Sequence, residues 1–296
     1  MHDPRLNALR DTVQSDVGQR GLAQHPHDNL FTALHDDFAA ACHAIADHPA
    51  PHIAILTGFY IATADPPCGE TDGPLGAIYL ARAFVKLGIA CEILADGFCC
   101  HALEVGIRVA GMDGRVKVRP LPTLPDDEVT HVIAIERVGP AGDGRCYSMR
   151  GRDITEFMQP VESLFAECTR RGIVTIGIGD GGNEIGMGRM PLETIERNIP
   201  NGRKIACRLA TDHLIVAGIS NWGGYALAAG ITMLRGVSPD PSLTDLDLER
   251  RILQAMVDEG PLVDGKTGKR QATVDGVEFA EYANFIVELY RNGGKD

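Results

Sequence analysis

Short apolar runs alternate with segments of helical periodicity along most of this 296-residue chain. Strands are expected at residues 52–57, 89–94, 131–135 and 173–178, and helices at 75–87, 101–110 and 155–171. Such alternation is typical of parallel strands that are joined by helical crossovers. We therefore predict a three-layer α/β fold, in which a mostly parallel, Rossmann-like sheet carries helices on both faces.

The remaining segments complete this picture. We expect a short edge strand at 116–118, one or two strands at 206–210 and 213–217, and helices at 222–234, 246–258 and 276–291. Residues 1–48 are expected to form an N-terminal helical arm, and residues 49–296 a single α/β catalytic domain. The helix at 222–234 is rich in small residues and could pack inside the domain or against a second copy, so a homo-oligomer stays open.

Charge and hydropathy exclude several classes of partner. The net charge of −12 argues against a nucleic-acid surface, which would need a basic face. No apolar run approaches the roughly 20 residues of a membrane span. The N-terminal segment lacks the apolar region of an export signal. We expect a cytoplasmic protein that acts on a small molecule and binds neither nucleic acid nor membranes.

Acidic side chains follow several of the predicted strands. Glu70 and Asp72 come after the first strand, Glu136 after the third, and Asp180 and Glu184 after the fourth. The carboxyl ends of parallel strands meet at one edge of a sheet, which is where α/β proteins bind their ligands. We therefore expect these acids to surround one pocket.

The glycine-rich turn GIGDGGNE at 177–184 has three interpretations. It contains a formal G-x-G-x-x-G after a strand, as dinucleotide-binding turns do, but Asp180 would oppose a pyrophosphate. It could also be a purely structural turn. In the third interpretation, which we favour, Asp180, Asn183 and Glu184 supply polar chemistry or hard oxygen ligands.

Other candidates have equally plain structural explanations. Arg137 could form a surface ion pair or bind substrate, and Arg150 could be a solvated loop residue or a carboxylate clamp. Thr71 and Asp72 precede a predicted helix, and Asn221 lies at the start of another. Each of these three could cap a helix or contact a ligand.

Five segments together are characteristic of one family. They are GETDGP at 69–74, ERVG at 136–139, YSMRG at 147–151, IGIGDGGNEIGMG at 176–188 and SNWGGYAL at 220–227. On these motifs the chain resembles the D-glutamate cyclase family over most of its length. The resemblance implies an α/β fold and the conversion of D-glutamate to 5-oxo-D-proline with loss of water. It also implies a divalent cation, Mn²⁺ or Mg²⁺, and we expect no organic cofactor.

This reaction has two chemical demands. The substrate's α-amine must lose a proton to a general base, and its γ-carboxylate must be neutralised before the amine can attack it. Our hypothesis makes Glu136, Asp180 and Glu184 the metal ligands, with Asn183 as a neutral oxygen donor.

The same hypothesis assigns the proton transfer and the substrate contacts. Glu70 or Asp72 takes the ammonium proton, and Arg150 holds the α-carboxylate. The roles of base and ligand could be exchanged. Further substrate-binding candidates are Thr71, Arg137, Asn183 and Asn221.

Two rival functions fit the same residues. A metal-dependent hydrolase, either a phosphatase or an amidohydrolase, would use the carboxylates to activate water. A nucleotide-binding or sensor module would use the G-x-G-x-x-G turn without catalysis. The residues alone do not choose between these functions, nor between D and L substrates.

Overall fold

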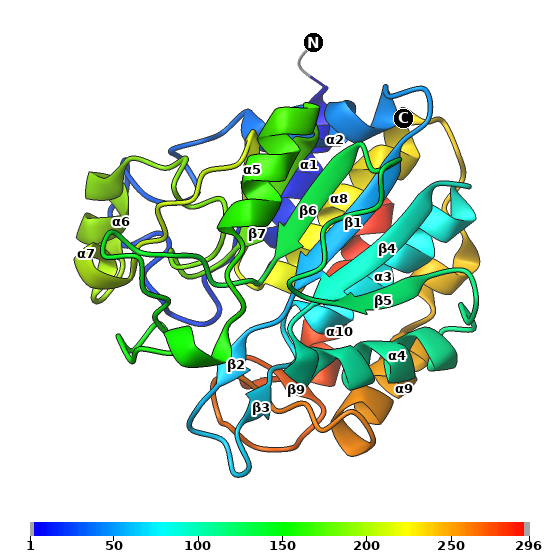
Figure 1. The fold of residues 1–296 in the computed structure, drawn as a ribbon. Helices are drawn as coiled ribbons and strands as arrows, with labels where there is room; N and C mark the ends of the chain where they lie inside the picture. The colour runs from blue at the N-terminus through cyan, green and yellow to red at the C-terminus, as the bar shows by residue number, and fades with distance from the viewer. Residues whose placement is uncertain (1–2, 293–296) are drawn as a thin grey trace.

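The computed structural model describes residues 3–292 and is built around a six-stranded parallel sheet (Figure 1). The strand order is β5-β4-β1-β6-β7-β8, and each neighbouring pair is parallel. The strands are β1 (His52–Thr57), β4 (Ala90–Ala95), β5 (Lys117–Pro120), β6 (His131–Ile135), β7 (Val174–Gly179) and β8 (His213–Val216). The chain reverses its direction of travel across the sheet between β1 and β6, which is the topological switch point of a Rossmann-like fold.

Helices and short strands complete the described chain. The helices are α1 (Pro4–Val13), α2 (Asp37–Ala46), α3 (Pro74–Lys86), α4 (Gly97–Val109), α5 (Glu162–Arg171), α6 (Leu192–Asn198), α7 (Gly202–Ile205), α8 (Ser220–Leu234), α9 (Leu246–Asp258) and α10 (Phe279–Asn292). Outside the sheet lie two 3₁₀ turns, η1 (Thr155–Phe157) and η2 (Pro241–Thr244). Two antiparallel strand pairs also lie outside it: β2 (Tyr60–Ile61) with β3 (Cys68–Gly69), and β9 (Thr273–Val274) with β10 (Val277–Glu278). Within residues 3–292, no helix combines the length and apolar character needed to cross a membrane.

The two faces of the sheet are buried under different helices because successive side chains of a strand point to opposite sides. In β1, Ile53 and Ile55 belong to the large core shared with α1, α2, α3 and α8. Ala54 and Leu56 belong to a smaller core with Leu164 of α5. Figure 1 shows α5 on the near face of the sheet and α8 on the far face. The predicted three-layer α/β fold is confirmed.

The N-terminal arm packs directly on this core. Leu6 and Leu9 of α1 and Phe38 of α2 are buried in the same cluster as the β1 side chains. The Gly218 N–H after β8 also donates to the Val13 carbonyl (2.8 Å). Between α1 and α2 the chain runs through turns, and this turn segment carries Arg20 to the end of the sheet.

Two predicted elements differ from the structure. The helix expected at 155–171 is split into η1 and α5, because Pro160 disfavours helical backbone at the residue before it. The strand expected at 206–210 does not form: only Ala210 makes isolated bridges there, to the loop after β7. The other predicted strands and helices agree with the structure to within a few residues.

Candidate functional site

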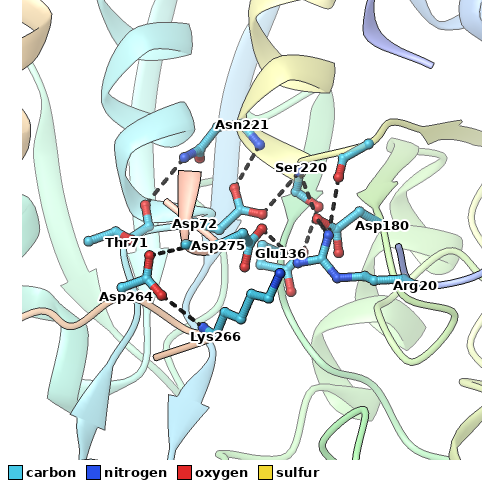
Figure 2. A network of polar contacts seen from close by, with 12 residues as sticks. Arg20, Thr71, Asp72, Glu136, Asp180, Ser220, Asn221, Asp264, Lys266 and Asp275 are labelled. Atoms are coloured by element: carbon cyan, nitrogen blue, oxygen red, sulfur yellow. Dashed lines mark hydrogen bonds and ion pairs between the residues drawn. The ribbon is translucent and has the colours of Figure 1, made fainter. Parts of the chain in front are cut away.

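Acids from three strand ends meet beyond the carboxyl edge of the sheet (Figure 2). Asp72 lies after β1, Glu136 directly after β6, and Asp180 directly after β7. One carboxylate oxygen from each lies within 4.8 Å of the others, and all three residues are buried. Because β6 and β7 are neighbours in the sheet, their ends deliver Glu136 and Asp180 to one place, and Asp72 reaches the same place from the turn that leads into α3. The expected convergence of strand-end acids is confirmed for these three.

The N-terminus of α8 holds the acidic triad of Asp72, Glu136 and Asp180 in place. The Ser220 N–H donates to Asp72 Oδ2 (3.0 Å) and Asp180 Oδ2 (3.2 Å), and the Asn221 N–H donates to Asp72 Oδ1 (2.8 Å). The Ser220 hydroxyl donates to Glu136 Oε2 (2.5 Å). The first N–H groups of a helix have no partner within it and favour negative charge, so α8 stabilises the triad.

Two of the triad residues, Glu136 and Asp180, line a cavity of about 330 Å³, whereas Asp72 lies behind them and does not line it. The cavity floor contains Glu70, Glu136, Asp180 and Asp275 together with Arg20. Its walls and mouth are formed by loops after β1 and β6 and by the loop before β9; they include Phe59, Tyr60, Ile61, Met149, Arg150, Arg152, Ile154 and Lys266. The predicted base candidate Glu70 therefore faces the same space as the triad residues Glu136 and Asp180.

Arg20 and Asp275 belong to the site but not to the set of site residues predicted from the sequence. The Arg20 guanidinium forms ion pairs with Asp180 (2.9 Å) and Asp275 (2.6 Å), and only 17% of its side chain is exposed. Burial opposes the charge, but the carboxylates of Asp180 and Asp275 outweigh it and raise the pKa of Arg20 well above its ordinary value. The segment DVGQRGL at 16–22 and the repeated VDG at 263–265 and 274–276 were the available signals.

The two VDG turns are tied together by the first of their aspartates. Asp264 Oδ2 accepts hydrogen bonds from the Thr273 hydroxyl (2.6 Å) and the Gly276 N–H (2.6 Å). This arrangement presents Asp275 to Arg20 and brings Gly265 against Glu70. A Cβ added to Gly265 would lie 1.6 Å from Glu70 Oε2. Only glycine leaves room for the Glu70 carboxylate at this point.

Gly265→Ala is therefore expected to displace Glu70 and to lower turnover about 100-fold, since small misplacements of reacting groups have effects of this size. The measurement is the steady-state rate with D-glutamate, the substrate that the sequence resemblance implies, with circular dichroism as the check on folding. Gly97→Ala is the matched control, because a Cβ there meets nothing within 4 Å. Equal rates for both variants would contradict the expected displacement of Glu70 by a side chain at residue 265.

Burial and mutual repulsion dominate the electrostatics of the site. Burial, reinforced by neighbouring carboxylates, raises the pKa values of Glu70, Asp72 and Glu136 well above their ordinary ranges. Burial also raises the pKa of Asp180, although Arg20 opposes this shift. The backbone at Glu136 is left-handed (φ 43°), a conformation that costs energy outside glycine and is found at functional sites.

These shifts predict how stability depends on pH in the metal-free protein. Folded Glu70 keeps its proton to a higher pH than unfolded Glu70, whose pKa is about 4.5. The folded state therefore binds more protons above that pH, and stability falls as pH rises toward neutrality, by up to about 1.4 kcal/mol per pH unit for each such group.

Thermal unfolding between pH 5 and 8 in the presence of a chelator measures this slope. Glu70→Gln removes one contributing group, so its melting temperature is expected to fall less steeply with pH than that of the wild type. Glu104→Gln, at an exposed position outside the cavity, is the control and keeps the wild-type slope. A steeper decline in Glu70→Gln would contradict the raised pKa.

The predicted ligands Asn183 and Glu184 face their own turn instead of the cavity. Glu184 Oε2 accepts from the Gly182 N–H (2.8 Å) and Oε1 from the Asp180 N–H (3.4 Å). The Asn183 side-chain amide donates to the Tyr147 carbonyl (2.7 Å), while its Oδ1 is buried with no hydrogen-bond partner. Both residues shape the turn that presents Asp180.

Three predicted substrate-binding residues also have structural partners. Arg137 is fully buried and pairs with Asp96 (2.7 Å), away from the cavity. The Thr71 hydroxyl donates to the Thr273 carbonyl (2.8 Å). Asn221 Oδ1 accepts from the N–H groups of residues 73 and 76 and so caps α3. Arg150 does line the cavity, at its exposed mouth.

The glycine-rich turn after β7 lacks the context of a dinucleotide-binding motif. Such a motif leads directly from its strand into a helix whose N-terminus binds the pyrophosphate. Here the chain passes through turns and isolated bridges, and α6 begins only at Leu192. The interpretation of this turn as a dinucleotide-binding motif is therefore wrong.

Comparison with known proteins identifies the family of this chain. A family model described as D-glutamate cyclase-like, C-terminal, matches residues 9–290, and this range contains Arg20, the triad and Asp275. The chain belongs to this family. The resemblance that the five sequence motifs indicated is thereby confirmed.

A curated member of the D-glutamate cyclase-like family gives the scale of the similarity. The human protein named D-glutamate cyclase, mitochondrial, is 31% identical to this chain over 250 residues. The match covers 78% of this chain and 39% of the human protein, so the chain spans well under half the length of that relative.

Proposed function

We propose that this chain is a lyase that converts D-glutamate to 5-oxo-D-proline and water. The observation that carries the proposal is the cavity in which Arg20 and the buried acids of separate strands converge, within a chain of the D-glutamate cyclase-like family. A site of this kind suits a small substrate that carries both an ammonium group and carboxylates. Glutamate is such a substrate.

Arg20 and the acids around it would orient the α-carbon end of glutamate, which carries both a carboxylate and an ammonium group. The Arg20 guanidinium lines the cavity floor and can contact the substrate α-carboxylate there. We therefore assign this role to Arg20, which is held between Asp180 and Asp275. The sequence prediction gave it to Arg150, which lies exposed at the mouth. The adjacent carboxylates of Glu70 and Asp275 would attract the ammonium group.

Glu70 is the proposed general base. It lines the cavity, and its raised pKa makes its ionised form a stronger base toward the ammonium proton. The new bond joins the α-nitrogen to the γ-carboxyl carbon, and one carboxyl oxygen leaves. The two protons that the nitrogen loses are the two that this oxygen gains as it becomes water.

The acidic triad fits a divalent cation, for which we propose Mn²⁺ or Mg²⁺. Its donors are hard carboxylate oxygens within 4.8 Å of one another, and the cavity floor holds more acids than Arg20 alone can balance. Asp72, Glu136 and Asp180 would hold the ion, in place of the predicted set with Asn183 and Glu184. When bound, the ion would neutralise and polarise the γ-carboxylate of the substrate.

The test is to incubate the metal-reconstituted protein with D-glutamate and L-glutamate and to measure 5-oxoproline by chromatography. We expect product from the D enantiomer and its loss after chelation. A phosphate ester and 5-oxo-D-proline in the same panel distinguish the hydrolase alternative. Hydrolysis of the ester without cyclisation would overturn the proposal. The cytoplasmic location, the lack of a nucleic-acid or membrane partner and a homo-oligomer stay predictions.

A further inference from the structure

The cavity extends well beyond its acidic floor. Above Glu70 and Asp180 lies an apolar belt formed by Phe59, Tyr60, Ile61, Met149 and Ile154. The exposed arginines Arg150 and Arg152 lie at the mouth, and Lys266 also lines the cavity, with its ammonium group directed toward the acids (Figure 2). Acids with Arg20 at the bottom, apolar groups in the middle and cations at the top therefore form three zones along one path.

The apolar belt is a firmly built surface. The Tyr60 ring stacks on Phe157 with 4.3 Å between ring centroids, and it meets the edge of Phe98 at 5.1 Å. Phe59 and Ile154 are buried in the same small cluster. Free glutamate has only two methylene groups, which its own charged ends confine to the floor. The belt therefore offers apolar contact that free glutamate does not use.

The cations at the mouth carry charge that no carboxylate neutralises. Among residues 3–292, Arg150 and Arg152 form no ion pair with an acid. Arg150 instead donates to the Lys266 carbonyl and Arg152 to the Ala62 carbonyl, each at 3.3 Å. These contacts position the guanidinium groups and leave them positively charged. In a chain of net charge −12, the mouth of the cavity is therefore a local site for an anion.

We infer that the site takes γ-glutamyl peptides, in which an amino acid is joined to the γ-carboxyl group of glutamate. The inference rests on the proposed function, because the glutamyl part occupies the same floor. The side chain of the attached amino acid would lie on the apolar belt, and its carboxylate would reach Arg150 and Arg152. Such a substrate matches all three zones.

The chemistry of this substrate balances without a further reactant. The α-nitrogen forms its bond to the γ-carbonyl carbon, and the bond from that carbon to the peptide nitrogen breaks. The α-ammonium loses two protons, and the leaving nitrogen gains two as it departs as the ammonium group of a free amino acid. The γ-carbonyl of an amide carries no negative charge, so it is a better target for the amine than the carboxylate of free glutamate.

The experiment compares γ-D-glutamyl-leucine, its uncharged C-terminal amide and D-glutamate on the same enzyme. We expect 5-oxoproline and leucine from the peptide, with kcat/KM about 10-fold above that for D-glutamate because the leucine side chain covers apolar surface. The amide is expected to be about 5-fold poorer than the peptide, the effect of an exposed charge contact.

Variants assign the carboxylate contact. The double variant Arg150→Gln/Arg152→Gln is expected to bring the ratio of kcat/KM for peptide and amide close to 1, whereas Arg145→Gln keeps the wild-type ratio. Arg145 pairs with Asp153 and lies outside the cavity. The ratio isolates the contact at the mouth, because a general loss of folding or turnover affects both substrates alike.

The outcomes separate the two proposals. Turnover of D-glutamate without turnover of the peptide overturns this inference and leaves the proposed function standing. Turnover of the peptide alone supports the inference and overturns free D-glutamate as the substrate. Turnover of neither compound overturns both.

Discussion

Replacing Asp180 by asparagine is expected to lower the turnover of D-glutamate at least about 1,000-fold. Asparagine keeps the shape of the side chain but removes its negative charge. That charge pairs with Arg20 (2.9 Å) and forms one corner of the acidic triad. Its loss should therefore misplace Arg20 and weaken cation binding together. The measurements are the single-turnover rate and the Mn²⁺ content after dialysis.

The fold should survive this substitution, because Asp180 lies at the end of β7 and the neutral side chain is easier to bury. Asp153→Asn is the control, since Asp153 is exposed, pairs with Arg145 and does not line the cavity. We expect its activity to equal that of the wild type. A folded Asp180→Asn protein with wild-type turnover would refute the role of the triad.

Arg82→Met is expected to lower the free energy of unfolding by about 3–5 kcal/mol, because it leaves a buried carboxylate without its partner. Arg82 of α3 and Glu249 of α9 form an ion pair (2.5 Å) whose side chains are both almost fully buried. Glu249 also accepts from the Tyr225 hydroxyl (2.7 Å), which bonds to the Tyr282 hydroxyl (2.5 Å). This network joins four helices behind the site.

Thermal and urea unfolding measure this effect, and the melting temperature should fall by roughly 10 °C. The double variant Arg82→Met/Glu249→Gln should recover part of the loss, because no uncompensated charge remains buried. Arg170→Met is the control: its pair with Glu167 is exposed, so we expect a change below about 1 kcal/mol. Equal losses for Arg82→Met and Arg170→Met would show that burial of the pair does not matter.

The sequence allowed the acids of the strand ends to be predicted because their placement depends on local patterns. Apolar runs mark the strands, and the parallel arrangement brings their carboxyl ends together. Glu136 and Asp180 directly follow such runs, so their meeting requires only the correct strand order. The same patterns placed the helices, except where Pro160 interrupts one of them.

Side-chain direction could not be predicted in the same way. Glu136 and Arg137 are consecutive, yet the first faces the cavity and the second turns into the protein to meet Asp96. Glu184 lies on the predicted active-site turn but bends back to the N–H groups of that turn. A position at a strand end indicates the edge of the sheet, whereas the local backbone decides which way each side chain points.

Arg20 and Asp275 escaped prediction for a different reason. Neither follows a strand of the main sheet, and their ion pair joins segments near opposite ends of the chain. Only the packing of α1 and α2 on the core brings the arm close enough for this contact. Periodicity along a sequence carries no information about such distant pairs.

The ion pairs of Arg20 also constrain when the site can form during synthesis. Arg20 precedes both of its partners in the chain, so Asp180 and then Asp275 leave the ribosome after it. A nascent chain that has not yet reached Asp275 holds an incomplete charge balance around Arg20 and lacks one wall of the cavity. The charge balance around Arg20 is therefore complete only after Asp275 has been synthesised and has folded against the N-terminal segment.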